Sequence, residues 1–93
     1  MNIKKLSIAR NKIDKIDNAI FLLIKKRNKV VNHVLTLKNF KNQIVDHKRI
    51  NKILRNIKTK SIRNNIDPKI TLKIWKAMIW GFIAFEKKEF KKK

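Results

Sequence analysis

Arginine is scarce in this sequence, and its positions are the first indication of chemistry. The chain has five arginines against 21 lysines, and three of the five are Arg10, Arg27 and Arg49. A guanidinium binds a carboxylate through two parallel hydrogen bonds, a geometry that the ammonium group of lysine cannot reproduce. These arginines therefore indicate a site for a small molecule that carries carboxylate groups.

The spacing of the cations along one helix shows which of them can act together. Arg27 and Lys38 are separated by 11 residues, about three turns at ~100° per residue, so they share a helix face at a distance of ~16 Å. Two long side chains leaning inward could hold a small dianion between them. Arg10 lies ~25 Å from Arg27 along the same helix and about a quarter-turn away. It cannot reach the ligand of its own Arg27, but a second helix could deliver it there.

Two of the six acidic residues stand at positions of interest. Asp46 precedes Arg49 by three residues, at the expected start of a helix, where it is first of all a candidate N-cap. Glu86 follows Phe82 by four residues, on the apolar side of another expected helix. An apolar environment favours the protonated form of a carboxyl group, which can donate a hydrogen bond.

One long helix must position most of the cations. Apolar residues repeat in a heptad pattern between residues 6 and 37, with neither Pro nor Gly in the segment. Nine of the ten repeat positions are apolar, and Arg27 is the exception. A buried guanidinium is costly unless it meets an anion. The repeat positions are Leu6, Ala9, Ile13, Ile16, Ile20, Leu23, Arg27, Val30, Val34 and Leu37.

The whole chain is predicted to be a single all-α domain over residues 1–93. Three helices are expected at about 3–38, 46–60 and 67–90, with a short connection at about 39–45. Asp67 and Pro68 give the third helix the clearest start signal. A first helix of ~48 Å is longer than a monomer of this size needs, so its apolar stripe is expected to meet a second chain.

Composition narrows the class of partner. The formal charge is +20, but the lysines are scattered over the chain rather than gathered on one face. This distribution favours a solvated surface over a nucleic-acid partner, and a small basic nucleic-acid-binding dimer stays the alternative. No apolar run approaches the ~20 residues of a membrane span. The lack of cysteine and of a signal-peptide pattern fits a cytoplasmic protein.

With these residues in place, the sequence resembles the all-helical class of chorismate mutases. The resemblance covers nearly the whole chain and implies an intertwined homodimer of three-helix protomers, in which Arg10 serves the opposite chain's site. The resemblance rests on the following residues and motifs: Arg10 in ARNKIDKID, Arg27 in LLIKKRNKVV, Lys38 after HVLTL, Asp46 to Arg49 as DHKR, and Glu86 in WGFIAFE.

The resemblance implies a Claisen rearrangement of chorismate to prephenate. This reaction is unimolecular and pericyclic, so it needs no nucleophile, metal or cofactor. The enzyme holds the substrate in its reactive conformation and stabilises charge on the breaking ether oxygen. By resemblance, Lys38 and Glu86 donate to the ether oxygen and Asp46 lies near the ring hydroxyl. The two substrate carboxylates are then bound by Arg27, Arg49 and Arg10 of the opposite chain.

Three positions differ from the bacterial form of that family. Ile50 replaces a glutamate that binds the ring hydroxyl, Phe82 replaces a small polar residue, and Glu86 replaces a glutamine. An ionised Glu86 would repel the developing oxyanion, so it is expected to act only when protonated. Ile50 and Phe82 are still expected among the substrate-binding residues. They also resemble the residues of the related isochorismate-pyruvate lyases, which makes that activity the close alternative.

Overall fold

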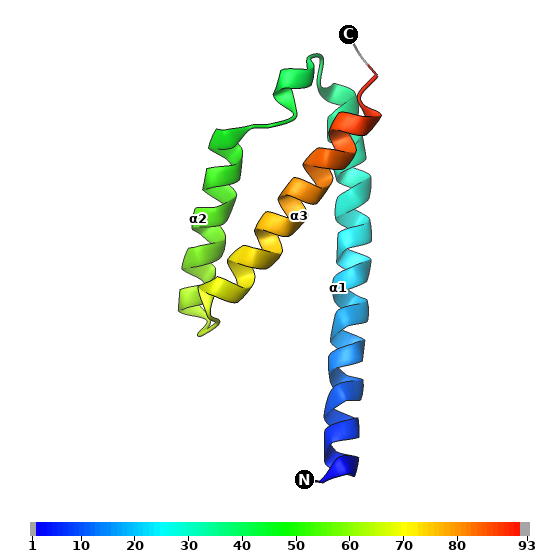
Figure 1. Ribbon diagram of the computed structural model, residues 1–93, viewed down its shortest axis with the longest axis vertical. Helices are drawn as coiled ribbons and strands as arrows, with labels where there is room; N and C mark the ends of the chain where they lie inside the picture. Colours follow the sequence, from blue (N-terminus) through cyan, green and yellow to red (C-terminus); the bar gives the residue numbers. More distant parts are fainter. Residues whose placement is uncertain (1, 92–93) are drawn as a thin grey trace. The chain divides into compact units, whose positions relative to one another are not determined.

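The chain folds into three α-helices. The computed structural model describes residues 2–91, which contain α1 (Ile3–Leu37), the 3-10 helix η1 (Lys41–Gln43), α2 (His47–Arg63) and α3 (Pro68–Glu89) (Figure 1). No strand occurs within residues 2–91. The predicted all-α class with a long first helix is therefore confirmed. The ends of the predicted domain, residues 1, 92 and 93, lie outside the described residues.

The described residues divide after Asn32 into two compact units. In the first unit, the apolar stripe of α1 is exposed to solvent. Ile13 is 54% exposed, Ile16 is 59% exposed and Leu23 is 63% exposed. A helix gains most of its stability in a protein by burying its apolar face, so this face of α1 lacks an apolar partner within its own unit.

The second unit is built on a helical hairpin of α2 and α3. Ile79 and Ile83 lie four residues apart on α3, so they present one apolar face. They form a core with Ile44 and Ile50, and all four are at most 7% exposed. Partly buried side chains surround this core: Leu35, Val45, Ile53, Leu54, Trp75 and Phe90.

Polar contacts define the turn between α2 and α3. Ser61, only 3% exposed, donates from its hydroxyl to the carbonyl of Ile57 at 2.7 Å. The hydroxyls of Ser61 and Thr71 are 2.6 Å apart, which links the two helices. The carboxylate of Asp67 accepts from the Lys69 N–H at 2.9 Å, and Pro68 follows at the first helical position. These are the start signals expected for the third helix.

Candidate functional site

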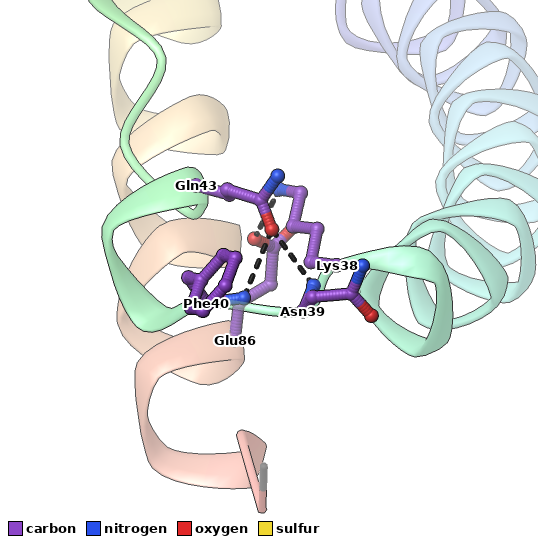
Figure 2. A network of polar contacts seen from close by, with 5 residues as sticks. All are labelled: Lys38, Asn39, Phe40, Gln43 and Glu86. Atoms are coloured by element: carbon purple, nitrogen blue, oxygen red, sulfur yellow. Dashed lines mark hydrogen bonds and ion pairs between the residues drawn. The ribbon is translucent and has the colours of Figure 1, made fainter. Parts of the chain in front are cut away.

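Lys38 and Glu86 meet in the second unit. The Lys38 ammonium nitrogen lies 3.2 Å from Oε2 of Glu86, although 48 residues separate them in sequence (Figure 2). Their side chains are 20% and 9% exposed, respectively. A charged pair with so little access to water interacts more strongly than one on the surface. Two groups expected to act on one substrate oxygen thus lie within hydrogen-bonding distance of each other.

The helices explain why each of these side chains is where it is. Glu86 follows Ile83 by three residues and Ile79 by seven, so it lies on the apolar face of α3 and is carried into the core. Lys38 is the first residue after α1, and its N–H donates to the carbonyl of Leu35 at 3.2 Å. Its long side chain can therefore leave the helix end and reach α3.

A glutamine that sequence reasoning did not single out organises the connection after Lys38. Oε1 of Gln43 accepts hydrogen bonds from the backbone N–H groups of Asn39 at 2.7 Å and Phe40 at 2.9 Å (Figure 2). The Gln43 N–H donates back to the Phe40 carbonyl at 3.0 Å. A glutamine three residues after a helix-initiating position is a known capping signal. That signal was available at Gln43, within a segment interpreted only as a connection.

A cleft lies beside the connection. Its volume is about 470 Å³, within the range of small-molecule sites, and it is lined by Lys38, Asn42, Gln43, Val45, Asp46 and His47. Oδ1 of Asp46 accepts from the Arg49 N–H at 3.0 Å, so this carboxylate caps α2. A negative charge at a helix N-terminus is favourable. Among the residues that line the cleft, Lys38 provides a cation, and the cleft is large enough for a small organic anion.

The remaining predicted residues are not all at this cleft. Arg49 is exposed on the first turn of α2, and Phe82 is half-buried on α3. The Ile50 side chain is 7% exposed and packs in the core. Arg10 is exposed and Arg27 half-buried on α1, in the first unit. The structure therefore brings Lys38 together with Glu86 and Asp46, and the substrate contacts of all the predicted residues stay predictions.

Within residues 2–91, no helix is long and apolar enough to cross a membrane. The same residues contain no group of three or more His, Cys, Asp or Glu side chains arranged to hold a metal ion.

Comparison with known proteins identifies the family. The model of the family described as chorismate mutase type II matches residues 9–87, most of the chain. The chain belongs to this family. A chorismate mutase from Methanocaldococcus jannaschii is 36% identical over 86 residues, which cover 91% of this chain and 87% of that protein. No solved structure matches the chain significantly.

Membership of the chorismate mutase type II family confirms the resemblance drawn from the sequence. The matched range includes every predicted site residue, from Arg10 to Glu86. Both comparisons support the predicted isomerase activity. The chain that contains the Lys38–Glu86 pair therefore belongs to a family whose name refers to a rearrangement of chorismate.

Proposed function

We propose that this protein is a chorismate mutase, which converts chorismate to prephenate. The observation that carries the proposal is the Lys38–Glu86 pair at 3.2 Å, beside a cleft, in a member of this family. In the reaction, the ether C–O bond breaks while a C–C bond forms within the same molecule. No group leaves and no electron is gained or lost.

The site must supply conformation and charge stabilisation. Holding the substrate in the compact form in which its ends meet removes much of the entropic barrier. The ether oxygen gains negative charge as its bond breaks, and preorganised donors stabilise that charge. We assign this role to the Lys38 ammonium and to Glu86 carrying a proton. In the unliganded protein these groups form an ion pair, so the substrate must separate them and Glu86 must take up a proton from the solvent.

Arginines are proposed to bind the two carboxylates of the substrate. Arg27 and Arg49 come from the same chain, and Arg10 comes from a second copy. Seventeen residues separate Arg10 from Arg27 on α1, a distance of about 25 Å along the helix axis, so one ligand cannot touch both. A second α1 that crosses or runs antiparallel to the first can bring its own Arg10 to the ligand that Arg27 of the first chain binds.

The same argument makes a homodimer part of the proposal. The exposed apolar side chains of α1 repeat at heptad spacing, which suits packing against another helix. A second copy of the chain both covers this face and provides Arg10, so the complete site requires two chains. A chain without cysteine also suits the cytoplasmic location that we include in the proposal.

Mixing two inactive variants tests the shared site. Arg10→Ala and Lys38→Ala are each expected to be nearly inactive as pure dimers. Hybrid dimers contain one intact site, so an equal mixture that has been unfolded and refolded should recover about a quarter of wild-type activity. The steady-state rate measures this recovery. Activity no higher than that of the separate variants would contradict a site shared between chains, provided that native mass spectrometry shows hybrids.

The protonation of Glu86 predicts a pH dependence. Glu86 can donate a hydrogen bond only in its protonated form, so kcat/KM should be higher in acidic than in alkaline solution. Glu86→Gln keeps an N–H donor at every pH and should flatten the profile. The measurement is kcat/KM across the pH range, with Glu89→Gln, on an exposed position of α3, as the control. The same slope in Glu86→Gln and wild type would remove Glu86 from the mechanism.

The substrate is tested by product identification. The protein is incubated separately with chorismate and with isochorismate, and the products are identified by NMR. Prephenate from chorismate is expected. Pyruvate from isochorismate would instead establish the lyase alternative, which Ile50 and Phe82 suggest by resemblance. If neither substrate disappears faster than in buffer, the enzymatic proposal is wrong.

A further inference from the structure

The connection between α1 and α2 holds its shape through one side-chain oxygen. Oε1 of Gln43 accepts from the N–H groups of Asn39 and Phe40, the two residues that follow Lys38 (Figure 2). Because this oxygen is occupied by two donors, the amide group of Gln43 has a defined orientation. The backbone bond from Gln43 to the Phe40 carbonyl closes the loop from the other side.

This arrangement connects Lys38 to a fixed point in the core. The residue after Gln43 is Ile44, which is 3% exposed and clusters with Ile79 and Ile83 of α3. Glu86 is carried on the same helix. The path from Lys38 through Gln43 to Ile44 therefore ties the start of the lysine side chain to the helix that carries its acidic partner.

Lys38 needs such support because the helix ends before it and its side chain is long. It lies beyond the last residue of α1, and lysine has a flexible four-carbon stem. Without Gln43, residues 39–42 would gain backbone freedom, since two N–H groups would turn to water. A misplacement of ~1 Å in an active site can lower the rate by a factor on the order of 10².

We propose that Gln43 is a positioning residue for Lys38: its side-chain oxygen holds the backbone of residues 39 and 40, and so places the Lys38 ammonium opposite Glu86. The inference rests on the proposed function only in its kinetic part. Its structural part concerns the shape of the connection and can be tested without any substrate.

The structural test is amide hydrogen exchange measured by NMR. In Gln43→Ala and in the similarly sized Gln43→Met, the amides of Asn39 and Phe40 should exchange several-fold faster than in wild type. Gln43→Glu keeps an acceptor oxygen and should retain slow exchange. Lys41→Ala, in the same 3-10 helix, is the matched control. Unchanged exchange in both Gln43→Ala and Gln43→Met would overturn the proposal.

The kinetic test separates positioning from direct contact with the substrate. Gln43→Ala should lower kcat about tenfold, with a smaller change in KM, because the donor is misplaced rather than removed. Gln43→Glu should recover most of kcat, although its charge raises KM for a dianion. In a Lys38→Ala background, Gln43→Ala should have no further effect on kcat, since a residue acting through Lys38 has nothing left to position.

Each outcome has a distinct meaning. An equal loss of kcat with and without Lys38 would show that Gln43 acts independently, which overturns the positioning role. Faster exchange with unchanged kcat would also overturn it. If the wild-type protein turns over no chorismate, the proposed function fails, while the exchange data still decide whether Gln43 holds the connection.

Discussion

Replacing Arg27 with alanine is expected to lower kcat/KM for chorismate by roughly 10²- to 10³-fold, which corresponds to about 3–4 kcal/mol. The physical reason is that a substrate carboxylate would lose its charged, doubly hydrogen-bonding partner. Arg27 is half-buried and is the only charged residue at a repeat position of the α1 stripe. The measurement is the rate of chorismate disappearance over a range of substrate concentrations.

Two variants control for the loss of charge at Arg27. Lys26→Ala removes one positive charge from the neighbouring, exposed position of α1 and should leave kcat/KM within about twofold, as expected for screened surface charges. Arg27→Lys keeps the charge but not the fork of donors, so its activity should fall between those of wild type and Arg27→Ala. Equal effects of Lys26→Ala and Arg27→Ala would show that Arg27 has no specific role.

The Arg27 experiment also addresses the nucleic-acid alternative. The chain carries 26 Lys and Arg residues, so removing one cation should scarcely change its retention on nucleic acid. If the Arg27→Ala variant loses turnover of chorismate but is retained on nucleic acid with the same salt dependence, turnover and nucleic-acid binding are separate properties. A parallel loss of both would contradict the carboxylate-binding role.

Replacing Lys38 with alanine is expected to lower kcat by roughly 10²- to 10³-fold, the usual effect of removing one donor to a developing oxyanion. The same change leaves the nearly buried carboxylate of Glu86 without its 3.2 Å partner. The free energy of unfolding of the Lys38→Ala variant should therefore also fall, by about 1–3 kcal/mol. Activity and urea-induced unfolding are measured on the same preparations.

A second substitution separates the two effects of Lys38→Ala. Glu86→Gln in the Lys38→Ala background removes the buried charge, so stability should recover while kcat stays low. Lys88→Ala, an exposed position on α3, controls for the loss of one cation near the site. If Lys38→Ala alone kept kcat within threefold of wild type, Lys38 would not be the donor to the ether oxygen.

Helix identity and helix starts could be predicted because they follow local rules, whereas α2 continues to Arg63, three residues beyond its predicted end. The heptad repeat over residues 6–37 predicted α1, and the structure gives a helix from Ile3 to Leu37. Asp46 and Asp67 were expected as N-caps, and each accepts a backbone hydrogen bond at the start of its helix. A cap requires only a side chain within three residues of an N–H group, so sequence spacing is enough to find it.

The contacts within the functional site could not all be predicted from such local rules. Lys38 and Glu86 were associated through resemblance to a family, because no spacing rule connects residues that are 48 positions apart. Gln43 was missed because its capping spacing lies in a short segment that was interpreted only as a connection. Ile50 was considered as a substrate contact, and the structure shows that its side chain packs into the apolar core.

The sequence by itself determined the all-α class, the three helices and the apolar stripe of the first helix, because helix periodicity and caps are encoded over a few residues. It also pointed to the scarce arginines as carboxylate ligands. Only the tertiary structure decided that the Lys38 ammonium meets Glu86. That contact depends on how the chain that leaves α1 packs against α3, and long-range packing has no local signature.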